Sequence, residues 1–165
     1  MFREMRRKRQ MLPEQESIEI LNNATSGVLA LLGDDGYPYA VPLSFVYDRG
    51  RIWFHGAKSG HKLDAMTRNS KASFCVIDRD QVTPEAYTTH YRSVIVFGKM
   101  RILEDAQEKR TAIEKLAAKF GSDGDAAGRA AAIDREWEAL CMMELTIERM
   151  SGKEAAELAR KRRGK

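Results

Sequence analysis

The chain has 165 residues, of which 43% are hydrophobic and 32% charged, a composition typical of one globular domain that can bury a core. No apolar run approaches the ~20 residues that a membrane-spanning helix needs, and no apolar segment follows the basic start of the chain as it would in a secretory signal. Cys75 and Cys141 lie in apolar runs, which predicts buried thiols and neither a disulfide framework nor a metal site. We therefore expect a cytoplasmic protein without a membrane segment.

The net charge of +4 comes from the two ends of the chain. Residues 1–10 and residues 157–165 each carry five basic side chains and one acid, so the body keeps 18 of the 28 basic and 22 of the 24 acidic side chains. Basic ends can bind nucleic acid, but they are more often solvated and poorly ordered, and no nucleic-acid-binding motif accompanies them. The sequence thus disfavours nucleic acid as a partner. The predicted parts are a basic tail at 1–13, one domain at 14–153 and a basic tail at 154–165.

Short helices and strands alternate in the first part of the chain. Early acids and apolar residues at 18, 20 and 21 predict the first helix. Pro42 lies inside the second strand, which requires an edge, a bulge or an interruption there because proline cannot donate to a ladder. Ser59 is a candidate N-cap for the second helix. The predicted elements are a helix at 14–23, strands at 26–33, 37–47 and 51–56, and a helix at 60–68.

The second part of the chain contains longer elements. Gly98 interrupts a long strand and predicts a bulge or a barrel corner. Gly121 closes a strongly amphipathic helix. The predicted elements are strands at 71–78 and 91–104, helices at 105–120 and 129–137, a strand at 140–150, and loops at 79–90 and 122–128. Five or six antiparallel strands with hairpin turns predict a small closed barrel with helices packed outside.

The exit of the third strand carries the features of an anion site. A Gly/Ser-rich loop leads into a helix, and Lys58, His61 and Lys62 lie at this junction. Free backbone N–H groups at a helix N-terminus favour an anion, whereas cations in the first turn oppose the helix dipole unless an anion is also present. The pattern therefore predicts a phosphate-bearing ligand. No spacing of Ser, His, Cys or Asp supports nucleophilic catalysis or a metal site.

Five segments in the same order resemble the pyridoxamine-phosphate-oxidase-like FMN-binding split barrels and, within them, the nitroimidazole-resistance (Nim) flavoproteins. The segments are GYPYAVPLSFVYDRG (36–50), IWFHGAKSGHKLD (52–64), ASFCV (72–76), QVTPEAYTTHYRSVIVFGK (81–99) and ERMSGK (148–153). The resemblance spans most of residues 18–153. It implies a mainly β protein with flanking helices, an antiparallel split β-barrel and a homodimer with FMN at the dimer interface.

The resemblance also implies which residues contact the cofactor. It places the flavin phosphate at the helix start, the flavin beside the second strand, and a polar side chain of the fifth strand near the cofactor. His55 matches the histidine of the Nim proteins beside the flavin, and we expect it to donate a proton to the bound acceptor. The oxidases carry arginine where this chain has Ala40 and His61. The expected cofactor-binding residues are Val41, Pro42, Leu43, Ser44, His55, Gly56, Ala57, Lys58, Ser59, Gly60, His61, Lys62, Tyr91 and Ser93.

These expectations describe an FMN-dependent oxidoreductase that reduces a small electrophile such as a nitroaromatic compound. NAD(P)H is one candidate for the electron donor. One alternative is a split barrel that uses deazaflavin or haem in place of FMN. Another is a flavin-binding or ligand-sequestering module without turnover, since the sequence contains no evident catalytic acid beyond His55 and Tyr91.

Overall fold

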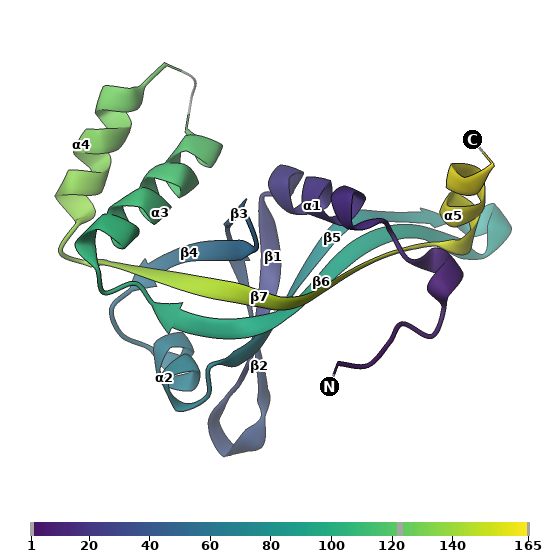
Figure 1. Ribbon diagram of the computed structural model, residues 1–165, viewed down its shortest axis with the longest axis horizontal. Helices are drawn as coiled ribbons and strands as arrows, with labels where there is room; N and C mark the ends of the chain where they lie inside the picture. The colour runs from purple at the N-terminus through teal and green to yellow at the C-terminus, as the bar shows by residue number, and fades with distance from the viewer. Residues whose placement is uncertain (1, 122–123, 165) are drawn as a thin grey trace.

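The computed structural model describes residues 2–121 and 124–164 (Figure 1). Seven antiparallel strands form one sheet in the order β2-β1-β5-β6-β7-β4-β3. The strands are β1 (Ser26–Leu32), β2 (Pro38–Ser44), β3 (Val46–Asp48), β4 (Arg51–Ala57), β5 (Lys71–Thr83), β6 (Thr88–Ile102) and β7 (Leu140–Glu154). The helices are α1 (Glu14–Asn23), α2 (His61–Arg68), α3 (Ala106–Phe120), α4 (Ala126–Glu136) and α5 (Ala156–Arg163), with 3-10 turns η1 (Lys8–Gln10), η2 (Asp34–Gly36) and η3 (Pro84–Ala86).

The sheet curls into a split β-barrel, as predicted. Its two edge strands, β2 and β3, are consecutive in the chain and only Phe45 separates them. The curl therefore brings the edges near each other. The closed barrel predicted from the strand pattern is wrong, because no ladder of hydrogen bonds among the described residues joins β2 to β3. β7 lies between β6 and β4 and joins the two halves of the sheet. Pro42 lies in the edge strand β2, where a missing N–H is tolerated, while the interruption falls at Phe45.

Two apolar clusters stabilise this arrangement. Inside the barrel, the buried rings of Phe45 and Phe54 meet the ring of Phe74 edge-on, at centroid distances of 4.9 and 5.1 Å. Helices α1 and α2 add apolar side chains to this interior cluster. A second cluster lies under α3 and α4, on the outer face of β4 and β7 (Figure 1). None of the helices described is long and apolar enough to span a bilayer.

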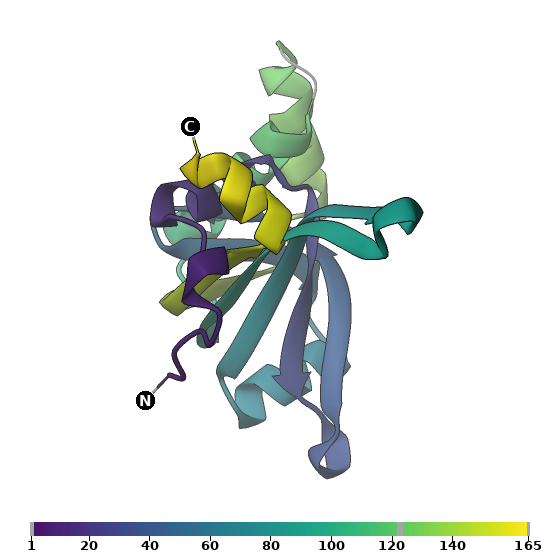
Figure 2. The same ribbon diagram turned by 90° about the vertical axis from the view of Figure 1, so that its right-hand side faces the viewer.

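The sequence predicts most elements but misplaces one long hairpin. α1 covers residues 14–23 as predicted, and Gly98 sits at an irregularity in the β6–β7 register. An added Cβ at Gly98 would lie only 2.0 Å from the Thr146 carbonyl oxygen, which explains the need for glycine. The predicted loop at 79–90 is wrong, because β5 and β6 stay paired as far as Thr83 and Thr88. This hairpin projects from the barrel (Figure 2), so it shows no core-facing alternation.

Both ends of the chain fold onto the body of the protein. The predicted C-terminal tail contains α5, and Ala159 of this helix is buried. Near the other end, Leu12 is buried in the interior cluster. Arg162 links the two by donating to the Met11 carbonyl oxygen at 3.0 Å and to Glu154 at 2.7 Å. The described parts of the two ends therefore differ from the solvated, poorly ordered tails that their composition suggests. Residues 1 and 165, and 122–123 of the predicted loop, lie outside the described residues.

Candidate functional site

The start of α2 has the backbone geometry of an anion site. Gly60, and not the predicted Ser59, is the N-cap, and its φ of +124° favours glycine. No side chain caps this helix. The Gly60 carbonyl accepts hydrogen bonds from the N–H groups of Leu63 and Asp64, which leaves the N–H groups of His61 and Lys62 available. These groups and the helix dipole favour a negative charge at this point.

Lys62 adds a half-buried ammonium group to the same place. Its Nζ would lie 3.2 Å from a Cβ added at Gly56, so the side chain passes under the end of β4. Burial lowers the pKa of Lys62 because desolvation disfavours the charged form. Within residues 2–121 and 124–164 this ammonium forms no hydrogen bond or ion pair. A half-buried cation without a partner is the strongest single feature of the site, since such groups are normally paired.

His61 points away from Lys62. Its ring stacks on Tyr39 of β2 at a centroid distance of 4.0 Å and an interplanar angle of 22°. Its Nε2 lies 3.6 Å from Asp34 Oδ2, and Asp34 also pairs with Arg68. A hydrogen bond from Arg68 lowers the pKa of Asp34. His61 thus holds the start of α2 against the β1–β2 turn, and Lys62 is the cation in the first turn of α2 that has no partner among the described residues.

The predicted residues of β2 fall on two faces. Val41 and Leu43 are half-buried and pack against the interior cluster, whereas Pro42 and Ser44 are exposed on the outer face. The stacking of Tyr39 on His61 joins this strand to α2. The structure therefore places β2 beside the start of α2.

His55 lies on the outer face of β4 and is exposed. Side chains alternate along a strand, so His55 points to the same side as Trp53, and Gly56 faces the side occupied by Lys62. His55 pairs with Met142 across the β4–β7 ladder. A single ligand can contact both His55 and Lys62 only around the end of β4, where the exposed residues Ala57, Lys58 and Ser59 lie.

Tyr91 and Ser93 lie far from this junction in the same chain. Both are near the start of β6, where Ser93 pairs with Ile77 and Lys153. The other end of β6 is the one that approaches α2, since the N–H of Met100 donates to the Ser70 carbonyl just after that helix. One chain therefore does not bring all the predicted cofactor residues together.

The outer face of the sheet between these two groups is apolar. The register places Val28, Cys75 and Ile95 side by side on β1, β5 and β6. Val28 and Ile95 are each 39% exposed, and Phe97 follows on the same face at 40%. Ile77, at 64%, extends the row toward the projecting hairpin. An apolar strip of this kind on a barrel surface is typical of an interaction face.

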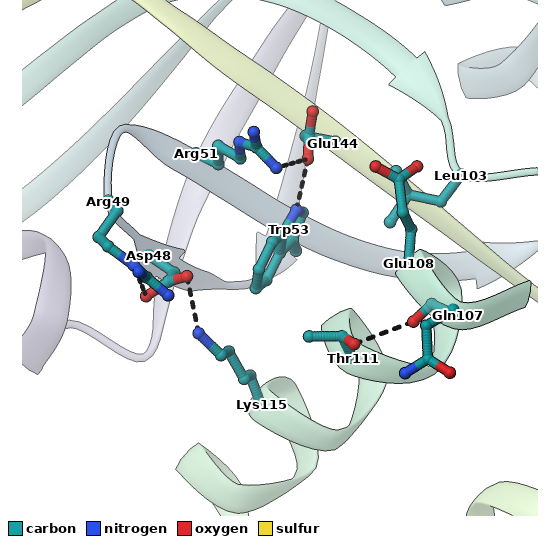
Figure 3. A pocket seen from close by; sticks show the side chains of 10 residues that line it. All are labelled: Asp48, Arg49, Arg51, Trp53, Leu103, Gln107, Glu108, Thr111, Lys115 and Glu144. Atoms are coloured by element: carbon teal, nitrogen blue, oxygen red, sulfur yellow. Dashed lines mark hydrogen bonds and ion pairs between the residues drawn. The ribbon is translucent and has the colours of Figure 1, made fainter. Parts of the chain in front are cut away.

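A separate cavity of about 490 Å³ lies between α3 and β4 (Figure 3). None of the predicted cofactor residues lines it. At its base Glu144 is 2% exposed and accepts hydrogen bonds from Trp53 Nε1 at 2.8 Å and Arg101 Nε at 2.9 Å. Asp48 and Lys115 pair across the rim at 2.7 Å. The charged side chains of this cavity are largely paired with one another. They therefore form a structural network and leave little free positive charge to bind an anion.

Sequence reasoning missed this network, although an acid inside the apolar run of β7 was a visible signal. Burial acts to raise the pKa of Glu144, but hydrogen bonds from Arg101 and Trp53 outweigh it and lower the pKa below its ordinary value. The carboxylate therefore stabilises the fold at pH values above about 4.5, and this contribution is lost as pH falls through the lowered pKa.

Replacing Glu144 by alanine should lower the free energy of unfolding by about 3–5 kcal/mol, because Arg101 and Trp53 would lose their buried acceptor. Urea unfolding at pH 7 measures this change. Glu148→Ala on the same strand is the control, since Glu148 is more exposed and its 3.6 Å pair with Lys99 should contribute about 0–1 kcal/mol. Equal losses in the two variants would contradict the role given to Glu144.

A protein-family model described as pyridoxamine 5'-phosphate oxidase matches residues 13–154. The chain belongs to this family. The structure agrees, because the family's split-barrel fold is the one described above. No curated protein sequence matches the chain. In the described part of the chain, no group of three or more His, Cys, Asp or Glu side chains is placed to hold a metal ion.

Several solved structures share the fold of this pyridoxamine 5'-phosphate oxidase family member. One is a protein of Bacteroides thetaiotaomicron VPI-5482, assigned as a 5-nitroimidazole antibiotic resistance protein, with 20% identity and a TM-score of 0.74 over 87% of this chain and 85% of that one. A FAD-binding protein of Mesorhizobium loti has 22% identity and a TM-score of 0.66, covering 88% and 97%. A FAD- and haem-binding protein of Mycobacterium smegmatis has 22% identity and a TM-score of 0.72, covering 89% and 73%.

Proposed function

We propose that the protein binds FMN through its phosphate at the start of α2 and is an oxidoreductase for a small electrophile such as a nitroaromatic compound. The observation that carries this proposal is the half-buried ammonium of Lys62, which has no partner in the described part of the chain and lies beside free N–H groups. A phosphate there would supply the missing partner and complement the helix dipole. Family membership and the flavin-binding names of structural neighbours support a flavin as the phosphate-bearing group.

The residues present fit such a cofactor. The ammonium of Lys62 and the backbone N–H groups of His61 and Lys62, which follow the N-cap Gly60, would hold the phosphate, with Lys58 and Ser59 adjacent. The outer face of β2 and the end of β4 would border the flavin ring. When bound, the flavin supplies the redox chemistry. The protein contributes the anchor, the shape of the site and, at His55, an imidazole N–H that gives a proton to the reduced acceptor.

The site is proposed to be completed by a second copy of the chain. Tyr91 and Ser93 lie at the opposite end of β6 from α2, so they can join the site only from another protomer. The apolar strip of Val28, Cys75 and Ile95 lies between the two groups and is suited to isologous pairing. A two-fold axis would then create two equivalent flavin sites.

The purified protein is expected to sediment as a homodimer. Ile95→Asp should give a monomer with weaker flavin binding, because it puts a charge into the apolar strip. Phe120→Asp is the matched control, since Phe120 is 45% exposed on α3 and away from the strip. Analytical ultracentrifugation of both variants tests the proposal, which a flavin-loaded monomer of the parent protein at micromolar concentration would contradict.

The cofactor and the reaction are tested in two steps. An absorption spectrum of the protein as purified, followed by chromatography of the released cofactor, distinguishes FMN from FAD, deazaflavin and haem. Anaerobic titration with NADH or NADPH, and then with a nitroimidazole, tests for turnover. Flavin that is bound but never reduced or reoxidised would favour the alternative of a binding or sequestering module. The free thiols Cys75 and Cys141 suit the reducing cytoplasm proposed as the location.

A further inference from the structure

The two basic ends of the chain form one surface. η1 and α5 are separated by most of the sequence but lie side by side in both views (Figures 1 and 2). Between them is a shallow cavity of about 230 Å³, lined in part by Arg9, Arg160 and Arg163. Gln10 lies under this cavity and is 6% exposed. The folding of both ends onto the body therefore concentrates charges that the sequence places at opposite ends of the chain.

The cations of this surface divide into paired and free groups. Arg162 is half-buried and pairs with Glu154, and Arg160 contacts Glu157 at 3.1 Å. A second set is exposed and forms no side-chain hydrogen bond or ion pair within residues 2–121 and 124–164. This set, which we call the basic surface, consists of Arg6, Arg7, Arg9, Lys161 and Arg163. Arg162 fixes α5 in place, while the basic surface faces solvent.

The shape and composition of the surface select one class of partner. Ala155 and Ala159 are buried against the body and Leu158 is half-buried, so α5 presents no wide apolar face that could enter a lipid bilayer. Residues 3–11 and 153–164 contain no aromatic side chain on which single-stranded bases could stack. Met11 is 47% exposed, and Phe2, just before this segment, packs against Phe97 at a centroid distance of 5.6 Å. The surface is therefore dominated by free arginine and lysine groups, which suit the regular phosphates of a duplex.

We propose that the basic surface binds the phosphate backbone of double-stranded nucleic acid without sequence preference. The surface lies at the end of the sheet away from α2 (Figure 1), so a duplex can occupy it without covering the start of that helix. The excess positive charge of the protein would then lie at the duplex-binding surface. The body carries more acidic than basic side chains and would repel the phosphates of the duplex elsewhere. This proposal does not depend on the flavin.

Fluorescence anisotropy of a labelled 30-base-pair duplex DNA with the full-length protein tests the proposal at 50, 100 and 200 mM NaCl. We expect binding that weakens linearly on a double logarithmic plot, and equal affinity for two unrelated sequences. The variant R160Q/K161Q/R163Q removes two cations of the basic surface and the neighbouring Arg160, which lines the cavity. It should bind at least tenfold more weakly at 50 mM NaCl, with a salt slope smaller by about 2–3. The control K71Q/K99Q/R135Q, with the same change in net charge, should stay within about threefold of the parent.

A second variant, R6Q/R7Q/R9Q, should reproduce the loss and keeps the test decisive if α5 is disturbed. Circular dichroism checks that all variants are folded. The proposal is overturned by an absence of binding at 50 mM NaCl, by equal losses in the control, or by tighter binding to single strands. Tighter binding to anionic phospholipid vesicles than to the duplex would likewise overturn it and assign the surface to a membrane.

Discussion

Replacing Lys62 by alanine is expected to weaken FMN binding by ten- to about a hundredfold, which corresponds to a charge-assisted contact of ~1.5–3 kcal/mol. The ammonium group is half-buried and has no partner among the residues that the structure describes, so a bound phosphate would gain its full charge at little additional desolvation cost. Titration of flavin fluorescence with apoprotein measures the loss. Lys62→Met should behave in the same way, because it keeps the side-chain stem beside Gly56 and removes only the charge.

Lys58→Ala is the matched control, since Lys58 is exposed and more strongly screened. It should weaken binding much less than Lys62→Ala. Small and equal effects of the two changes would place the phosphate elsewhere. The pH dependence gives an independent check. Burial sets the pKa of Lys62 below its ordinary 10.5, so FMN affinity should fall as pH rises through this lowered value, and the Lys62 variants should lack this fall.

Replacing His55 by alanine is expected to lower the rate of acceptor reduction by ~10²–10⁴-fold and to leave FMN affinity nearly unchanged. His55 is exposed on the outer face of β4, and Lys62 lies on the other side of the strand end. The two residues are therefore suited to different parts of one ligand. Stopped-flow reoxidation of the reduced protein by a nitroimidazole measures the rate per bound flavin.

The control for this change is His90→Ala, because His90 lies in the projecting hairpin opposite Gln81 and has no assigned role. Its rate and FMN affinity should match the parent. If His55→Ala instead lost FMN and turned over normally with flavin in excess, His55 would be a binding residue. Comparison with Lys62→Ala separates these cases. Lys62→Ala should lose FMN affinity and keep the rate per bound flavin, whereas His55→Ala should keep FMN affinity and lose the rate.

Local signals predicted much of the fold correctly. α1 and α3 were predictable because acids at the start, apolar spacing and the closing Gly121 act within one helix. The projecting β5–β6 hairpin was not, because strands outside the core need no hydrophobic alternation. α5 has a composition that also suits a frayed end, and only its packing against η1 and Glu154 distinguishes the two.

The candidate site shows a similar division. The loop and helix start at 58–62 were predictable because the whole feature lies in one short segment. The orientation of the His61 side chain could not be predicted, because it depends on contacts with Tyr39 and Asp34. The Trp53–Glu144 hydrogen bond joins residues 91 positions apart, and no local pattern could indicate it.

The central place of β7 has a consequence during synthesis. β4 pairs with the short β3 on one side and with β7 on the other. β7 is therefore the strand that connects β6 to β4. Until residues 140–154 have left the ribosome, the nascent chain therefore consists of two unjoined sheets, each with an unpaired strand edge. A chain that stops before residue 140 should accumulate in the pellet fraction of a cell lysate, whereas the full chain should not. The last strand to be made is thus the one that covers the free edges of β6 and β4, which could otherwise pair with neighbouring chains.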